Sequence, residues 1–146
     1  MIALSNLCDQ AFQEKKLVRQ AEKILRLLKI APATSLEIFL LGSQRMRQLN
    51  KKLRGKDKAT TVLSFEAKGF LVAESRFLGE VYLCPAAVAR QGIPGRPEIR
   101  GLNTRLIYYL IHGILHLKGY DHIGSPLAAK SMEKKEAEIF QKIFRK

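Results

Sequence analysis

The sequence has few cysteines, and the two that it has lie far apart. Cys8 and Cys84 form neither a C-x-x-C pair nor the closely spaced set typical of a disulfide-rich secreted domain. We therefore interpret both as reduced thiols and expect no disulfide partner. The first ten residues, MIALSNLCDQ, carry no basic stretch ahead of an apolar run, so they do not match a secretory signal peptide. These absences favour a cytoplasmic protein.

Long apolar runs are also absent. The longest, Leu106–Leu117, is shorter than the roughly 18 residues that a membrane-spanning helix needs, and it contains two histidines. Internal repeats and low-complexity tracts are absent too. Since domains cluster around roughly 100–200 residues, the 146 residues fit a single domain, 1–146, that is long enough to bury a core.

Acidic residues are scarce relative to basic ones. The chain has 26 Lys and Arg against 13 Asp and Glu, a formal charge of +13. Such an imbalance favours a polyanionic partner, nucleic acid before anionic membrane, although it also fits a merely basic soluble protein. In residues 45–58 a single acid, Asp57, stands among seven basic residues: Arg45, Arg47, Lys51, Lys52, Arg54, Lys56 and Lys58. This density suits a track for an RNA backbone.

Hydrophobic periodicity and turn residues predict alternating helices and strands. Helices are expected at 10–29, from Ser43 as N-cap to Gly55, at 85–90, at 99–117 and from Pro126 onward, after Ser125 as N-cap. Strands are expected at 35–41, 60–66 and 77–84. In the last helix we expect these side chains to face the core: Leu127, Met132, Ile139, Phe140 and Ile143. The fold class is α+β, a small mixed β-sheet covered by helices.

The only three histidines of the chain fall within eleven residues, HGILHLKGYDH, 112–122. His112 and His116 are four residues apart, so they share one face of the predicted helix. Gly119 can end that helix in the left-handed conformation, which lets His122 approach from outside it. Three imidazole nitrogens that leave a fourth position open are typical of catalytic zinc. We predict that His112, His116 and His122 bind one Zn²⁺ ion; the alternative is that they are hydrogen-bonded packing residues.

One acid is missing from this motif. The spacing H-x-x-x-H-x-x-G-x-x-H is that of metzincin proteases, in which glutamate, the general base, follows the first histidine. Here Gly113 takes its place. The site is therefore metzincin-like in its ligands but lacks the proton carrier of a peptidase. Asp121 is equally interpretable as a partner for a ligand's second nitrogen or as a turn residue.

Three segments together resemble the YbeY family of bacterial rRNA maturation factors, which are metal-dependent endoribonucleases. They are HGILHLKGYDH at 112–122, LNKKLRGKDKATTVLSFE at 49–66 and LGEVYLC at 78–84. The resemblance implies that the three histidines are the zinc ligands and that Arg54 is the active-site arginine. Ala59 and Thr61 depart from the family's usual proline and aspartate, but the ligands and the arginine are intact.

The resemblance also implies a function. It is single-strand-specific, zinc-dependent endoribonuclease activity in 16S rRNA 3′-end maturation and ribosome quality control, with rRNA and the small ribosomal subunit as partners. The residue chemistry agrees, because zinc lowers the pKa of bound water to about 7 and a guanidinium grips phosphate oxygens. The nucleophile, water or the substrate 2′-OH, stays open. The alternatives are a metallopeptidase-like hydrolase and a non-catalytic ribosome-assembly factor with structural zinc.

Overall fold

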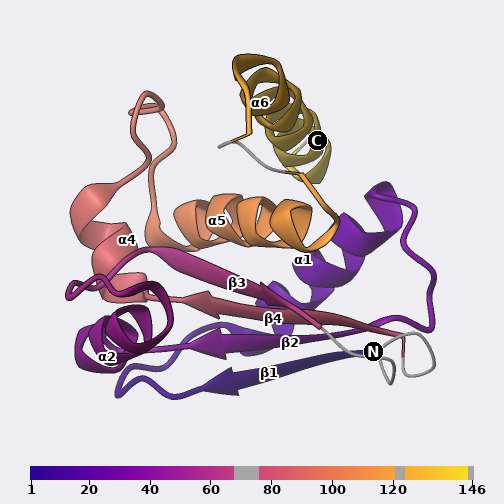
Figure 1. Ribbon diagram of the computed structural model, residues 1–146. Coiled ribbons are helices and arrows are strands. Elements are labelled where there is room, and N and C mark those ends of the chain that lie inside the picture. The colour runs from indigo at the N-terminus through magenta and orange to yellow at the C-terminus, as the bar shows by residue number, and fades with distance from the viewer. Residues whose placement is uncertain (68–75, 121–123, 145–146) are drawn as a thin grey trace.

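A computed structural model describes residues 1–67, 76–120 and 124–144 (Figure 1). The elements along the chain are β1 (Ile2–Asn6), α1 (Glu14–Leu27), β2 (Ser35–Leu40), α2 (Ser43–Arg54), β3 (Val62–Glu66), β4 (Phe77–Leu83), α4 (Pro85–Gln91), α5 (Leu102–Leu117) and α6 (Pro126–Ile143). The predicted α+β class, with a small mixed sheet flanked by helices, is confirmed. Neither Cys8 nor Cys84, both described, forms a disulfide. Over the same ranges, no helix has the length and apolar composition to cross a bilayer.

The four strands form one sheet in the order β1-β2-β4-β3. Strands β1, β2 and β4 run parallel, and β3 pairs antiparallel with β4, so β3 is an edge strand of the sheet formed by the described residues. The sequence did not predict β1. Its residues Ile2 and Leu4 pair with Leu36 and Ile38 of β2, more than thirty positions along the chain. A short strand with so distant a partner carries little local signal.

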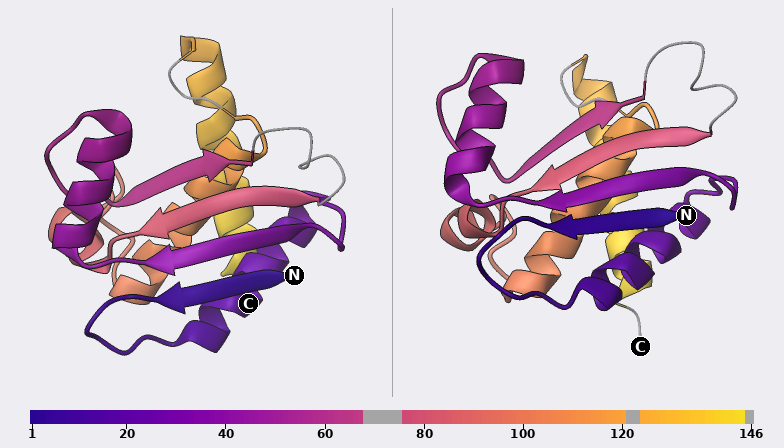
Figure 2. Two further views of the ribbon diagram at one scale, coloured as in Figure 1. Left: turned by 60° about the horizontal axis from the view of Figure 1, so that its bottom comes forward. Right: turned by 90° about the horizontal axis from the view of Figure 1, so that it is seen from below.

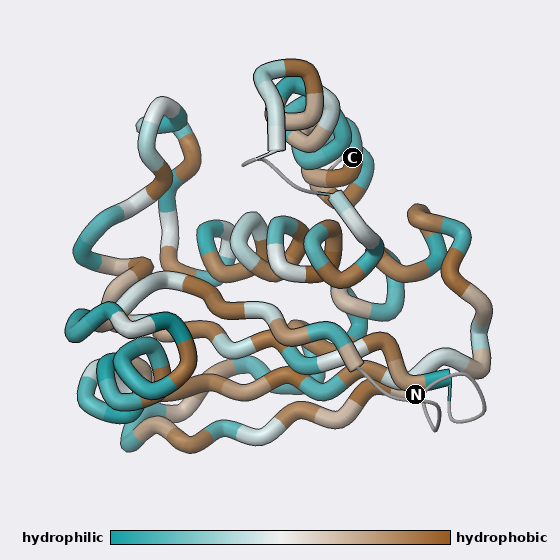
Figure 3. The backbone as a smooth tube through the Cα atoms, in the orientation of Figure 1, coloured by the Kyte–Doolittle hydropathy of each residue, from teal (hydrophilic) through white to brown (hydrophobic). Residues whose placement is uncertain are grey.

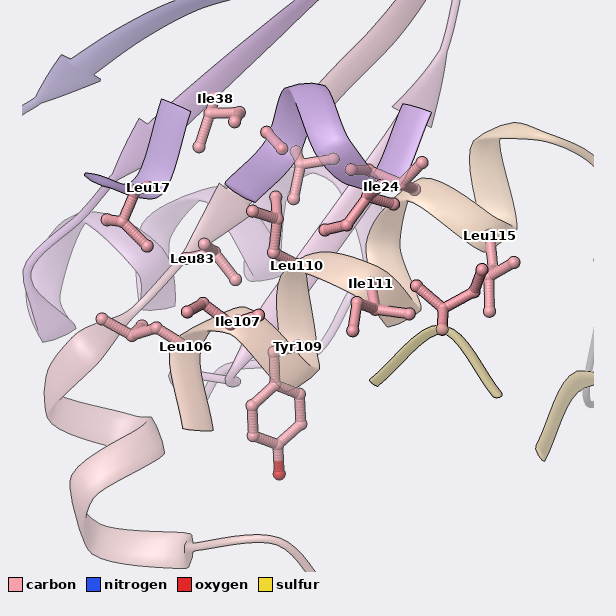
Figure 4. Close-up of a cluster of buried hydrophobic side chains, with 14 of the residues drawn as sticks. Leu17, Ile24, Ile38, Leu83, Leu106, Ile107, Tyr109, Leu110, Ile111 and Leu115 are labelled. Atoms are coloured by element: carbon pink, nitrogen blue, oxygen red, sulfur yellow. The ribbon is translucent and has the colours of Figure 1, made fainter. Parts of the chain in front are cut away.

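Helices α1 and α5 pack on one face of the sheet, and α6 packs on α5 and α1 (Figure 1). In the right-hand view of Figure 2, from below, the sheet faces the viewer. These three helices lie behind it, and α2 lies beside the strand ends. Hydrophobic residues (brown) predominate in the strands and recur along α5, whereas α2 is mostly hydrophilic (teal; Figure 3). The core between the layers joins Ile38 and Leu83 of the sheet to Ile24 of α1 and Leu110 of α5, all at most 1% exposed (Figure 4).

The helix ends confirm some predictions and correct others. Gly55 ends α2 at a φ of +70°, and the Ser125 hydroxyl accepts a hydrogen bond from the Ala128 amide at 3.0 Å, as an N-cap does. Ser43 is not a cap, because it is already helical and Gly42 precedes it without a side-chain bond. Leu127 is 79% exposed, not part of the core, since it lies in the first turn of α6, ahead of the first buried residue, Met132.

Gly113 lies at a close contact between α5 and the sheet. A Cβ built there would lie 2.9 Å from Val81 Cγ1, 3.1 Å from Ser64 Oγ and 3.3 Å from Val62 Cγ2. The Ser64 hydroxyl also donates a hydrogen bond to the Gly113 carbonyl at 3.1 Å. Position 113 therefore faces β3 and β4, and no side chain fits between this turn of α5 and the sheet without displacement.

We expect Gly113→Ala to destabilise the protein by about 1 kcal/mol, because overpacking costs about 1–3 kcal/mol and the better helix propensity returns about 1 kcal/mol. Chemical denaturation measures the change. Combining the substitution with Val81→Ala should reduce its cost, since the added methyl group then has space. Equal costs in both backgrounds would contradict a direct contact between the two positions.

Ser125→Ala should lower the free energy of unfolding by about 1 kcal/mol, because the Ala128 amide loses its side-chain acceptor. Ser131, exposed in the interior of the same helix, provides the matched control. Ser131→Ala is expected to be neutral or slightly stabilising. Thermal unfolding of both variants tests the pair, and equal melting temperatures would show that the cap contributes nothing.

Candidate active site

A cleft of about 640 Å³ runs between β3 and α5. Its lining includes residues 60–64 on the side of β3, His112 and His116 on α5, and Arg54 at the end of α2. The structure thus gathers three of the four residues that the sequence proposed for the site, although they come from two separate segments. The fourth, His122, lies outside the described residues, as does Asp121.

The two histidines of α5 point their Nε2 atoms at each other. These atoms are 3.1 Å apart, and the ring centroids are 4.7 Å apart. The prediction that both lie on one face of a helix is confirmed. Two nitrogens that each lie about 2.0–2.1 Å from a tetrahedral zinc ion are roughly 3.3 Å apart, so the pair fits such an ion after a small adjustment. Over the described ranges, however, no set of three histidine, cysteine, aspartate or glutamate residues is arranged to hold a metal.

A carboxylate that the sequence reasoning missed reaches His112 from α6. Glu136 is only 5% exposed, and its Oε1 contacts His112 Nδ1. Its Oε2 accepts a hydrogen bond from the Tyr108 hydroxyl at 3.0 Å. Burial and the neighbouring carboxylate raise the pKa of Tyr108, which keeps the phenol protonated as a donor.

The sequence does contain a signal for Glu136. It stands among the buried positions of α6, together with Met132, Ile139 and Ile143, at helical spacing. A charged residue on an apolar helix face needs a partner in the interior, because an unpaired buried carboxylate is costly. The sequence prediction assigns the apolar members of this face to the core and omits the glutamate between them.

Arg54 reaches the cleft from the last turn of α2. Its Nη2 donates a hydrogen bond to the Ser64 carbonyl at 3.4 Å, and its guanidinium carbon lies 5.5 Å from the centre of the Phe65 ring. The residue is nevertheless exposed. These contacts hold its side chain along β3. They leave other guanidinium N–H groups available to donate hydrogen bonds to a ligand in the cleft.

The loop after α2 is held by its own polar contacts. The buried Asn50 side chain donates to the Lys58 carbonyl at 2.9 Å. Arg47 donates twice to Asp57, at 2.7 and 3.1 Å, and this hydrogen bonding lowers the pKa of the aspartate. The single acid of the basic segment is therefore paired with Arg47, and of the other cations of 45–58 Arg54 lines the cleft.

Comparisons with known proteins connect this architecture to a family. The family model described as "Endoribonuclease YbeY" matches residues 4–144. Among proteins named Endoribonuclease YbeY, that of Ruthia magnifica subsp. Calyptogena magnifica is 32% identical over 144 residues, 98% of this chain and 96% of its own length. That of Anaeromyxobacter sp. strain Fw109-5 is 43% identical over 107 residues, which are 71% of this chain but 52% of that protein.

The fold is similar to that of a solved structure as well. The solution structure of TM1509 from Thermotoga maritima superposes with a TM-score of 0.67 at 26% sequence identity, covering 99% of this chain and 89% of that one. The similarity therefore extends over the whole arrangement of sheet and helices and is not confined to the histidine segment. On the match over residues 4–144 and the relatives at 32–43% identity, this chain belongs to the YbeY endoribonuclease family.

Proposed function

We propose that this protein is a zinc-dependent endoribonuclease that cleaves single-stranded RNA. We further propose that residues 1–146 act as one domain, that its substrate is rRNA of the small ribosomal subunit, in 16S 3′-end maturation and ribosome quality control, and that it works in the cytoplasm. The observation that carries the proposal is the convergence of His112, His116 and Arg54 on one cleft in a chain of this family.

The two imidazole donors that the structure describes in the cleft suit zinc. His112 and His116 would supply two nitrogens, and we propose His122 as the third ligand, which makes the site metzincin-like. When bound, zinc polarises a phosphoryl oxygen and lowers the pKa of water. Imidazole ligands favour zinc among the common ions, whereas carboxylate-rich sites favour magnesium or calcium.

Arg54 supplies the positive charge opposite the histidines. Its guanidinium can donate two parallel hydrogen bonds to the oxygens of the scissile phosphate, and it offsets the negative charge that grows there as the nucleophile attacks. Its contact with the Ser64 carbonyl and its position near Phe65 restrict the side chain before RNA binds. Water and the 2′-OH both fit as nucleophile, and a 2′,3′-cyclic phosphate on the product would identify the 2′-OH.

The geometry at Gly113 supports a nuclease over a peptidase. A peptidase of this motif has its general base at this position. Here the Cβ direction of position 113 leads toward Val81 and Ser64, so a side chain there would point at the sheet and would displace these atoms. The remaining alternative is an assembly factor in which zinc only stabilises the fold. In that case removing a zinc ligand would unfold the protein, whereas in a nuclease it would abolish cleavage.

Cleavage of a labelled single-stranded RNA by His116→Ala and Arg54→Ala tests the proposal. We expect His116→Ala to abolish cleavage, and Arg54→Ala to lower kcat by about 10²–10³-fold, the usual effect of removing one transition-state donor. Zinc content and circular dichroism are measured on the same samples. Arg26→Ala, an exposed arginine of α1 that does not line the cleft, is the matched control and should cleave normally.

Three outcomes would contradict the proposal in different ways. Undiminished cleavage in both variants would indicate a contaminating nuclease. Loss of fold together with RNA binding in His116→Ala would indicate structural zinc. Metal-dependent peptide hydrolysis by the pure wild type would favour the peptidase alternative.

RNA affinity should depend on salt through the basic residues of α2. For single strands the slope of log K against log salt changes by about 0.7 for each phosphate that the protein neutralises, so Lys51→Gln/Lys52→Gln should make the slope shallower by up to about 1.4. Binding is measured by fluorescence anisotropy in the His116→Ala background, where the RNA stays intact. The control is Lys130→Gln/Lys134→Gln on α6, and equal slopes for the two pairs would rule out a track along α2.

A further inference from the structure

We propose that Glu136 is a positioning residue of the metal site, whose carboxylate holds His112 in the tautomer and ring orientation that present Nε2 to the cleft. The inference rests on the proposed function in one respect, that His112 is a metal ligand. It goes beyond that function because Glu136 lies on the C-terminal helix α6, and because neither the histidine motif nor the arginine segment contains it.

The carboxylate of Glu136 is held at both oxygens. Oε1 contacts His112 Nδ1, and Oε2 accepts the Tyr108 hydroxyl at 3.0 Å. Glu136 is 5% exposed, and Met132 and Ile139 on the same helix face are at most 1% exposed. A carboxylate in such surroundings is tolerated only when hydrogen bonds replace its hydration. Glu136 is therefore oriented by its partners, and it orients them in turn.

The chemistry of the contact determines where the proton of His112 lies. An ionised carboxylate only accepts hydrogen bonds, so Nδ1 must be the donor. In the neutral imidazole, Nε2 then carries the lone pair, and this is the atom that lies 3.1 Å from His116 Nε2. The same contact restricts rotation of the ring, because turning it would break the bond at Nδ1. Both effects prepare the nitrogen that a metal binds.

Such an arrangement has a known physical consequence. A carboxylate on the second nitrogen of a ligating histidine fixes the tautomer and raises ligand basicity, and its removal typically costs about 10–100-fold in metal affinity. The packing of α6 also supports the contact, since Phe140 meets Tyr108 edge-on with ring centroids 5.9 Å apart. Docking of the C-terminal helix on α5 thereby completes the orientation of a ligand that belongs to α5.

The test compares Glu136→Ala and Glu136→Gln with a matched control on the same helix. Glu133→Ala removes an exposed glutamate three residues earlier. Zinc affinity is measured by competition with a chromophoric chelator. Independently, ¹⁵N NMR of the metal-free protein reports which nitrogen of His112 carries the proton. Thermal unfolding of each metal-free variant separates a local change from loss of the fold.

We expect Glu136→Ala to weaken zinc binding by about 10–100-fold while Glu133→Ala binds as wild type. Wild-type His112 should carry its proton on Nδ1, and Glu136→Ala should shift it toward Nε2. Glu136→Gln keeps the size and one acceptor, so it should retain the Nδ1–H form and bind zinc with intermediate affinity. It thus tests the proposal even if Glu136→Ala fails to fold.

Two results would overturn the inference. One is unchanged zinc affinity in both Glu136 variants, and the other is the same His112 tautomer in the wild type and in Glu136→Ala. Failure of the proposed function looks different, because a wild type that binds no zinc or cleaves no RNA contradicts that function directly. The tautomer comparison needs neither metal nor RNA, so it still decides whether Glu136 positions His112.

Discussion

The close packing of α5 on the sheet is the constraint on which the rest of the structure depends. Its buried residues, which include Leu110, Ile114 and Leu115, fill the space between the layers. Gly113 lets one turn of the helix approach β3 and β4 more closely than a Cβ tolerates unless Val81 and Ser64 move. Because His112 and His116 lie on another face of the same helix, the helix that fills the core also lines the cleft.

This double use of α5 explains how a polar site exists next to an apolar core. His112 is partly exposed to the cleft, yet its Nδ1 meets a carboxylate that is almost fully buried. The cost of burying Glu136 is offset only while both of its partners stay in place. The site is therefore coupled to the docking of α6, and a change in that interface has consequences at the histidines. Tyr108, one turn before His112 on α5, belongs to the same network.

The parts that the sequence could predict are those whose cause is local. Three of these predictions depend on a few neighbouring residues each. They are the cap at Ser125, the left-handed Gly55 and the shared helix face of His112 and His116. The parts it could not predict depend on contacts between distant segments. Strand β1 exists because it pairs with β2, and Glu136 meets His112 because α6 packs on α5 in one particular register.

The replacement of glutamate by Gly113 has a structural as well as a chemical meaning. In the motif of the proteases this position carries the base, whereas here it is the point of contact between helix and sheet. An acid at this turn would have to displace side chains of the sheet. The charged group opposite the histidines comes from elsewhere, as Arg54 of α2, which lies along β3. A cation in that place suits a phosphate and does not replace the base that peptide hydrolysis requires. The chemistry that we propose for this helix thus differs from that of the proteases because position 113 packs on the sheet and because Arg54 lines the cleft.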